Sequence, residues 1–310
     1  MQTKTVRIGT RGSPLALAQA HETRDRLAKA HGRAIEDFEI VVIKVTGDQI
    51  LDRALSEAGG KGLFTKEIEQ ALLDGDIDLA VHSSKDMPTV LPDGLGLTAY
   101  LEREDVRDAF ISLKARSLME LPEGAVVGTA SLRRQAMVKR ARPDLKVITY
   151  RGNVQTRLKK LEAGEADATL LAYAGLRRLG LEHVAAGLFA IEDFLPAVGQ
   201  GAIGIETRLD DRATLDLVAA IHHAPTKVAL DCERAFLKVL DGSCRTPIAG
   251  HARIEGGELV FDGMILKPDG SEHHSAHFKG AVADAAAIGI AAGEMLRGRG
   301  GADFFAHLGG

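Results

Sequence analysis

The sequence contains no tryptophan, and aromatic residues of any kind make up only 4% of its 310 residues. Proteins that bind single-stranded nucleic acids stack the bases on aromatic side chains and track the backbone with basic surfaces. This chain has few aromatic residues, and its formal net charge of −4 opposes a general electrostatic fit to nucleic acid. We therefore expect a small-molecule partner and no nucleic acid, with any anionic ligand held by a local cluster of cations.

Long apolar runs and cysteines are scarce as well. No stretch is long and apolar enough to span a membrane, and the first ten residues, M-Q-T-K-T-V-R-I-G-T, contain no run typical of a signal peptide. These features predict a cytoplasmic protein without a membrane partner. Because reducing compartments do not sustain structural disulfides, the two cysteines are expected to be thiols, and each needs its own explanation.

What is present is a repeated strand and helix pattern in a chain too long for one ordinary core, which predicts two or three domains. Residues 6–9 are typical of a strand and 9–12 of a turn, and Ser13-Pro14 is an N-cap followed by proline at the first helical position. A similar strand, Gly-Thr turn and serine cap recur at 125–131. We interpret the pattern as two similar βα domains facing each other across a cleft; the alternative is chance recurrence of a common pattern.

The most informative stretch is D-L-A-V-H-S-S-K-D-M-P, residues 78–88. An apolar strand at 79–81 gives way to five polar residues, and Pro88 disfavours a helix immediately before it. Ligands in open α/β sheets bind beyond the carboxyl ends of the strands, so Lys85 and Asp86 are expected to point into a cleft. The alternative is a solvated turn with an internal Lys/Asp pair.

A basic segment follows in the middle of the chain. Between Gly128 and Lys160 there are ten Lys and Arg residues and one acidic residue. Arg133 and Arg134 lie in the first turn of a predicted helix, where cations oppose the helix dipole unless an anion joins them. Arg151 and Arg157 lie around another helix entrance, after a strand predicted at 145–150. These guanidinium groups indicate a ligand with several carboxylates or phosphates, and the sequence has no nucleotide phosphate-binding loop motif.

Two further segments are glycine-rich. Residues 46–61 are polar and are followed by Gly62, which is compatible with a lid over a cleft or with a plain surface loop. Residues 195–206 are predicted to form a glycine-spaced strand that could return the chain to the first domain.

The last third predicts a small antiparallel sheet with helical cover. Strands are expected at 248–254, 259–266 and 272–278, and a helix at 282–296. Cys232 falls on an apolar helical stripe and is expected to be a core residue. Cys244 lies instead in D-G-S-C-R-T-P, a flexible turn in which the neighbouring cation favours thiolate. The histidines at 273, 274 and 277 lack a matching carboxylate or cysteine pattern, so no metal site is expected.

Seven blocks together resemble the porphobilinogen deaminase (hydroxymethylbilane synthase) family. They are R-I-G-T-R-G-S-P-L-A-L-A-Q-A at 7–20, G-G-K-G-L-F-T-K-E-I-E at 59–69, the stretch at 78–88, V-G-T-A-S-L-R-R-Q at 127–135, R-G-N-V-Q-T-R-L at 151–158, L-P-A-V-G-Q-G-A-I-G-I-E at 195–206 and E-R-A-F-L-K-V-L-D-G-S-C-R-T-P-I-A-G at 233–250. The resemblance covers nearly the whole chain.

The resemblance implies an α/β protein of three domains. The first two resemble type II periplasmic binding proteins, with a hinge and a central cleft, and would comprise residues 1–100 with 198–220 and residues 101–197. The third, 221–310, is the small antiparallel sheet. The implied activity is that of a monomeric cytoplasmic transferase of tetrapyrrole and haem biosynthesis. It joins four porphobilinogen units stepwise, with loss of ammonia, to a dipyrromethane cofactor and releases the linear tetrapyrrole hydroxymethylbilane.

The resemblance also implies roles for individual residues. Deamination gives an azafulvene-like cation, and Asp86 would be the catalytic residue that stabilises it. Cys244 would carry the cofactor covalently, and no metal is implied. The residues that would bind the cofactor are Lys85, Thr129, Ser131, Arg133 and Arg134, and those that would bind the substrate are Arg11, Ser13, Gln19, Lys61, Phe64, Arg151, Arg157, Arg178 and Gln200.

Two other classes compete with this interpretation. A non-catalytic polyanion-binding protein would have the same cleft, but it gains nothing from a carboxylate at the site or a reactive turn at Cys244. A Schiff-base enzyme could use Lys85 with a pyridoxal cofactor, although no separate phosphate-binding site is evident. Intact-mass measurement distinguishes a two-pyrrole adduct on Cys244, no adduct, and a reducible imine.

Overall fold

The computed structural model describes residues 5–46, 64–240 and 247–305. The described chain divides into two compact units. The first comprises 5–46, 64–104 and 201–227, and the second comprises 105–200, 228–240 and 247–305. Among the described helices, none is both long enough and apolar enough to cross a bilayer.

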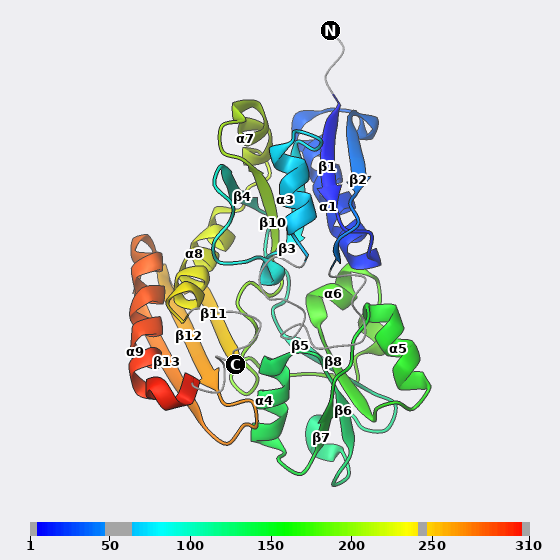
Figure 1. Cartoon of the computed structure of the whole chain (residues 1–310), viewed down its shortest axis with the longest axis vertical. Helices are drawn as coiled ribbons and strands as arrows, with labels where there is room; N and C mark the ends of the chain where they lie inside the picture. Colours follow the sequence, from blue (N-terminus) through cyan, green and yellow to red (C-terminus); the bar gives the residue numbers. More distant parts are fainter. Residues whose placement is uncertain (1–4, 47–63, 241–246, 306–310) are drawn as a thin grey trace. The chain divides into compact units, whose positions relative to one another are not determined.

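The first unit is built on a five-stranded sheet with the strand order β2-β1-β3-β10-β4 (Figure 1). The first three strands of this order are parallel, whereas β10 is antiparallel to both of its neighbours. The strands are β1 (Val6–Thr10), β2 (Phe38–Val42), β3 (Leu79–Ser83), β4 (Leu95–Tyr100) and β10 (Ile203–Arg208).

Helices enclose this sheet because each of its faces is apolar. Ile8, Leu27 and Leu79 belong to one buried cluster, and Ile68, Leu72 and Ile77 belong to another. Helix α1 begins where the Ser13 cap predicted, with the Ser13 hydroxyl accepting a hydrogen bond from the amide of Ala16. The helical segments of this unit are α1 (Pro14–His31), η1 (Ile35–Asp37), α3 (Lys66–Leu73), η2 (Ser84–Asp86) and α7 (Arg212–Ala219).

The prediction of a strand at 195–206 is wrong at its start, because β10 begins only at Ile203. Gly199 and Gly201 have φ angles of 74° and 87°, which extended strands do not use. The amide of Gly199 donates to the buried carboxylate of Glu233 at 2.7 Å instead of joining a strand ladder. The strand does return the chain to the first sheet, as predicted.

The second unit contains a five-stranded sheet with the order β7-β6-β8-β5-β9. Strands β6, β7 and β8 are parallel, and β5 is antiparallel to its neighbours. Each strand of this sheet therefore corresponds in position and direction to one strand of the first sheet (Figure 1). Its elements are β5 (Asp108–Ser112), η3 (Leu118–Glu120), β6 (Val126–Gly128), α4 (Leu132–Ala141), β7 (Lys146–Ile148), α5 (Val154–Glu162), β8 (Ala168–Ala172), α6 (Tyr173–Arg178), η4 (Glu182–Val184) and β9 (Gly187–Leu188).

The repeat extends to individual hydrogen bonds. The amide of Asp78 donates to the carbonyl of Arg7, and its carboxylate accepts from the Arg7 amide at 2.8 Å. In the second sheet, Asp167 makes the same two bonds with Val126, and the carboxylate accepts at 2.7 Å. This correspondence supports the interpretation that the two βα patterns in the sequence are a structural repeat.

The second unit also holds a three-stranded antiparallel sheet with helical cover, as predicted. Cys232 is fully buried in its core with Phe236 and Phe261, and burial raises the pKa of the thiol to about 12. Cys232 is therefore confirmed as a core residue. The elements are α8 (Ala224–Val239, of which the part from Val228 onward belongs to this unit), β11 (Ile248–Glu255), β12 (Glu258–Leu266), β13 (His273–Ala281), η5 (Val282–Asp284) and α9 (Ala285–Phe305).

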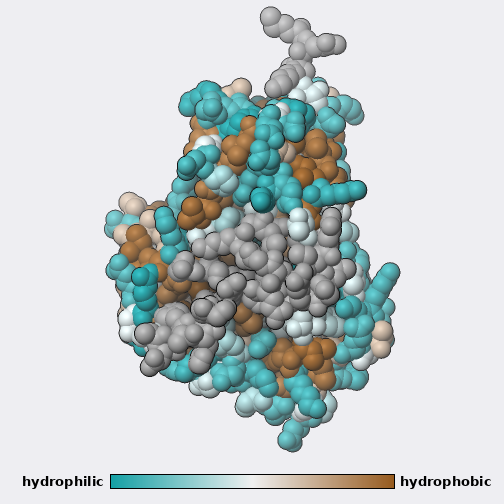
Figure 2. All heavy atoms as spheres, in the orientation of Figure 1, coloured by the Kyte–Doolittle hydropathy of each residue, from teal (hydrophilic) through white to brown (hydrophobic). Residues whose placement is uncertain are grey.

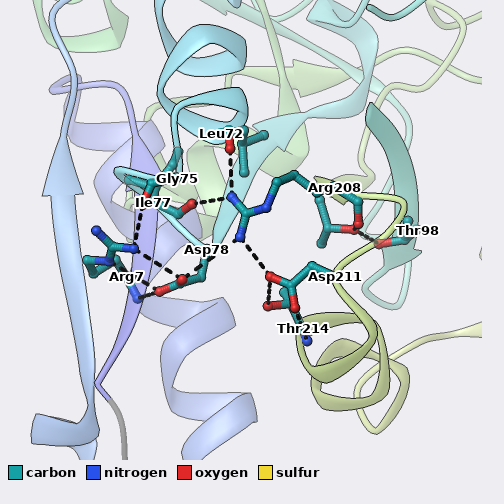
Figure 3. Close-up of polar contacts among 10 residues, drawn as sticks. Arg7, Leu72, Gly75, Ile77, Asp78, Thr98, Arg208, Asp211 and Thr214 are labelled. Atoms are coloured by element: carbon teal, nitrogen blue, oxygen red, sulfur yellow. Dashed lines mark hydrogen bonds and ion pairs between the residues drawn. The ribbon is translucent and has the colours of Figure 1, made fainter. Parts of the chain in front are cut away.

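Arg208, near the amino ends of the parallel strands in the first sheet, joins several segments (Figure 3). Its guanidinium donates to the carbonyls of Leu72 and Ile77 at 2.6 and 2.9 Å, and it pairs with the carboxylate of Asp211 at 2.7 Å. Asp211 also caps α7 by accepting from the amide of Thr214. One partly buried side chain thus holds α3, β3, β10 and α7 together.

Replacing Arg208 with methionine should lower the free energy of unfolding by about 2 kcal/mol, because partly buried carbonyl and carboxylate partners lose their donor. Urea denaturation followed by circular dichroism measures this loss. The matched control is Arg212→Met, which removes an exposed pair with Asp216 and should cost less than about 0.5 kcal/mol. Equal losses in the two variants would show that the Arg208 contacts add nothing beyond a surface ion pair.

Candidate active site

A pocket lies at the carboxyl ends of β1 and β3 in the first unit, where sequence reasoning expected a ligand. It brings together side chains that are far apart in sequence, including five of the predicted site residues. The lining residues are Arg11, Ser13, Leu15, Ala16, Gln19, Phe64, Thr65, Val81, His82, Ser83 and Asp86.

The amino end of α1 forms one wall of the pocket. Ser13 and Pro14 start the helix, so its first amide groups and the positive end of its dipole lie beside the pocket. Arg11 precedes the helix, and its guanidinium carbon lies 4.2 Å from the centre of the Phe64 ring. Stacking on the ring orients this cation. The wall is suited to bind a carboxylate.

Gln19 and Ser83 connect the helix to the sheet inside the pocket. The Gln19 Nε2 donates to the Ser83 hydroxyl at 2.9 Å, and Gln19 is almost fully buried. Ser83 was not among the residues predicted from the sequence for the site. The strand β3 extends through His82 and Ser83, two residues beyond the predicted end, and this extension places both residues in the pocket wall.

Asp86 and Lys85 lie in η2, a short 3₁₀ turn that ends before Pro88. Both side chains are exposed, and Asp86 lines the pocket. Lys85 is not one of the lining residues. The turn therefore presents a carboxylate to the pocket that also contains Arg11 and the start of α1.

In the second unit, Arg133 and Arg134 are buried around a carboxylate that sequence reasoning missed. The Asp108 carboxylate accepts from Arg133 Nη2 at 2.7 Å and from Arg134 Nη2 at 2.6 Å. Burial raises the pKa of Asp108, but the two guanidinium groups outweigh it and lower the pKa to about 2. The sequence predicted that an anion would join these arginines, and the Asp108 carboxylate is one such anion within the protein. Two guanidinium groups share this one carboxylate, so the cluster keeps a net positive charge.

Other predicted residues surround this cluster. Gln200 is fully buried, and its Nε2 donates to the carbonyl of Val106 at 2.7 Å and to Asp108 at 3.2 Å. The Thr129 hydroxyl accepts from the amide of Ser131, and the Ser131 hydroxyl accepts from the amide of Arg134. Thr129 and Ser131 therefore fix the turn that starts α4.

Arg151, Arg157 and Arg178 belong to the same edge of the second sheet. Arg151 follows β7 and is largely buried, and Arg157 lies in α5 with its Nε donating to the carbonyl of Gly152 at 2.9 Å. Arg178 ends α6, which follows β8. Because β6, β7 and β8 are parallel, their carboxyl ends share one edge, and the predicted arginines follow all three strands.

Two predicted site residues, Cys244 and Lys61, lie outside the described residues. Of the predicted lid at 46–61, the structure describes Thr46 alone. At the described end of that segment, Thr46 donates its amide and hydroxyl to the Glu67 carboxylate. Around the three-stranded sheet of the second unit, His274 contacts Glu272, and His277 contacts Asp262. No group of three or more potential metal ligands occurs among the residues that the structure describes.

Comparison with known proteins identifies the family. The family model "Porphobilinogen deaminase, dipyromethane cofactor binding domain" matches residues 6–216, and "Porphobilinogen deaminase, C-terminal domain" matches residues 228–298. The porphobilinogen deaminase of Paracoccus denitrificans is 60% identical over 300 residues, which is 97% of this chain and 96% of that protein. That of Nitrobacter winogradskyi is 62% identical over 298 residues, covering 96% and 94% of the two chains.

Among solved structures, a putative methionine-binding lipoprotein of Bacillus subtilis matches with a TM-score of 0.44 and 16% identity, covering 73% of this chain and 94% of that one. A methionine-binding protein matches with a TM-score of 0.45 and 17% identity, covering 77% and 96%. The sequence matches are far stronger than these, and they extend over both units at 60% identity or more. This chain therefore belongs to the porphobilinogen deaminase family.

Proposed function

We propose that the pocket of the first unit binds the incoming porphobilinogen and that Asp86 is the catalytic residue there. The observation that carries the proposal is the gathering of Arg11, Ser13, Gln19 and Phe64 around one pocket with Asp86. These groups come from the β1–α1 turn, from α1, from the segment before α3 and from η2, so the fold and not local sequence brings them together.

The overall reaction is that of the family. The enzyme is a transferase of tetrapyrrole and haem biosynthesis that joins four porphobilinogen units stepwise, with loss of ammonia, and releases hydroxymethylbilane. It carries a dipyrromethane cofactor, which, when bound, supplies the pyrrole to which the first unit is joined. Family membership also removes the pyridoxal alternative for Lys85.

The second unit has groups that fit such a cofactor. A dipyrromethane carries carboxylates on each ring, and the Arg133–Arg134–Asp108 cluster holds two cations for one anion. The Arg133 Nε is buried and has no hydrogen-bond partner among the described residues. We propose that Arg133 and Arg134 hold cofactor carboxylates, with Thr129, Ser131 and Lys85 as further donors, and that Cys244 is the attachment point.

Within the pocket, the cationic groups and the carboxylate have different roles. Arg11 and the amino end of α1 attract the carboxylates of porphobilinogen, while Gln19 and Phe64 keep the walls in place. Among the lining residues that the structure describes, Asp86 supplies the only carboxylate. There it can stabilise the cation that forms as ammonia leaves and pass a proton to the departing amine. We propose that Arg151, Arg157, Arg178, Gln200 and Lys61 contact the substrate or the growing chain.

A polyanion-binding protein without activity is the remaining alternative. It would gain nothing from Asp86, since a carboxylate repels the anion that the cations attract. Incubating the purified protein with porphobilinogen separates the two possibilities. We expect substrate consumption with ammonia release and, by native mass spectrometry, a series of species that differ by one pyrrole unit; binding without consumption would support the alternative.

Substitution of different arginines should stop the reaction at different stages, because each added ring brings two carboxylates to a fixed set of cations. Arg133→Met should abolish cofactor assembly, because a desolvated cofactor carboxylate would lose its guanidinium partner. Such a loss costs on the order of 3 to 5 kcal/mol. Arg157→Met should keep the cofactor and stall the chain after one or a few additions. Native mass spectrometry after brief exposure to substrate reads both outcomes.

Arg140→Met is the matched control for these variants, because Arg140 is an exposed residue in the last turn of α4. It should give the wild-type series of intermediates. If the Arg133 and Arg157 variants also gave the wild-type series and were merely slower, the arginines would act through the general potential and not by holding particular rings.

We also propose that the enzyme works as a cytoplasmic monomer, with domains at 1–100 plus 198–220, 101–197 and 221–310. The large exposed apolar side chains of the described chain are scattered over different elements: Ile35 in η1, Leu73 in α3, Ile148 in β7, Ile254 in β11 and Ile290 in α9 are examples. Figure 2 shows apolar areas interrupted by hydrophilic ones on the face in view. Such scattering is typical of a monomer, and light scattering coupled to gel filtration measures the mass.

A further inference from the structure

Behind the pocket of the first unit lies a cluster of ionisable side chains that the proposed mechanism does not use. His82, on β3, lines the pocket and is 6% exposed. Its Nε2 lies 3.1 Å from the Oε2 of Glu206 on β10, a carboxylate that is fully buried. Glu69 on α3 is the third member and is 8% exposed. Buried carboxylates are rare unless they are paired or functional.

The hydrogen bonding of the cluster is incomplete. The Oε1 of Glu206 and the Oε1 of Glu69 are both buried and have no hydrogen-bond partner among the described residues. Ser84, which follows β3, also has a buried hydroxyl without a partner there. Unsatisfied buried oxygens cost free energy, so a fold that keeps two of them on carboxylates beside a pocket calls for a role beyond stability.

The surroundings of Glu69 disfavour its ionised form. Burial raises the pKa of Glu69, and the neighbouring Glu206 carboxylate raises it further against the opposing effects of the Thr65 hydroxyl and His82. The contact between His82 Nε2 and Glu206 Oε2 fits donation of the Nε2 hydrogen to the carboxylate. This contact leaves Nδ1 of the ring as the atom that can take up a proton. The other titratable groups around His82 are Tyr100, which lies beside its strand partner Gly204, and Arg11 and Asp86 in the pocket.

We propose that His82, oriented by the Glu206 carboxylate, is a second proton-carrying residue of the pocket and accepts the ring proton that each condensation releases. The inference rests on the proposed function. Each condensation breaks the C–N bond of porphobilinogen and one C–H bond of the acceptor ring and forms one C–C bond. The C–N electron pair leaves with the amine, which takes a proton from Asp86 and departs as ammonia. The ring hydrogen leaves as a proton that passes to Nδ1 of His82 and returns to Asp86, so both groups are restored for the next condensation.

In this arrangement Glu206 is a positioning residue. Its anion holds the ring in one tautomer and compensates the charge of the imidazolium. The raised pKa of Glu69 opposes a second negative charge beside Glu206. Asp86 and His82 then divide the proton transfers, Asp86 at the departing amine and His82 at the acceptor ring.

The first test is Glu206→Gln, which preserves size and removes the anion. We expect kcat to fall by about 30-fold or more while KM for porphobilinogen changes less than about twofold, since general acid–base groups contribute roughly 10²- to 10⁴-fold. Asp74→Asn, an exposed carboxylate at the carboxyl end of α3, is the control and should leave kcat as in the wild type.

A second pair of measurements does not depend on whether Glu206→Gln folds. His82→Ala should lose about 100-fold in kcat and regain part of it with added imidazole, a recovery that a purely structural role would not give.

Unchanged kcat in Glu206→Gln, or the absence of imidazole rescue in His82→Ala, would each overturn the proposal. Failure of the proposed function looks different, because the wild type itself would then consume no porphobilinogen. Failure of this inference alone leaves the wild type active, with the cofactor mass present, and appears only in the variants.

Discussion

Replacing Cys244 with alanine should give folded protein that lacks both the dipyrromethane mass and all activity. The chain has two cysteines, and Cys232 is excluded as the attachment point by full burial and by a thiol pKa of about 12, because thioether formation needs an accessible thiolate. Cys244 is the remaining thiol. Intact-mass measurement of protein purified under native conditions reads the adduct directly, and circular dichroism checks the fold.

The matched control is Cys232→Ala. This change removes the other thiol from the core and should cost about 1 kcal/mol of stability while leaving the adduct in place. A Cys244→Ala protein that still carries the mass of two pyrrole rings, or a Cys232→Ala protein that loses it, would contradict the assignment.

Asp86→Asn should bind porphobilinogen with little change in affinity but turn it over at least about 100-fold more slowly. A unit charge about 4 Å from a cation is worth roughly 4 kcal/mol at an effective dielectric constant near 20, which corresponds to about a thousandfold in rate. Asparagine keeps the shape of the side chain and removes the charge. Single-turnover measurement of ammonia release isolates the chemical step.

Asp93→Asn serves as the control for Asp86→Asn, because Asp93 is an exposed carboxylate of the same unit outside the pocket. It should react at the wild-type rate. Near-normal turnover in Asp86→Asn would reduce Asp86 to a positioning role and would leave the stabilisation of the cation to other groups.

Features that depend on local sequence were predicted well. Ser13-Pro14 identified the start of α1, because an N-cap hydroxyl and a proline at the first helical position act within one turn of helix. The apolar stripe containing Cys232 identified its burial for a similar reason, since helical periodicity is local. The turn with Asp86 was found because polar residues interrupt an apolar strand.

Features that depend on contacts between distant residues were missed. Asp108 is 25 residues from Arg133, and its sequence signal is only an acidic residue at the start of an apolar strand. The start of β10 was misplaced because the amide of Gly199 bonds to Glu233, which lies 34 residues away. The cluster of His82, Glu69 and Glu206 likewise joins three elements that no local pattern connects.

The discontinuity of the first unit has a consequence for synthesis on the ribosome. Strand β10 lies between β3 and β4 in the first sheet, yet it follows the 105–200 segment that belongs to the second unit. At roughly 5 to 20 residues per second, the growing chain waits on the order of 5 to 20 s between the emergence of β4 and that of β10. During that interval β3 and β4 each have an exposed edge. A chaperone that shields strand edges would therefore help most at this stage of synthesis.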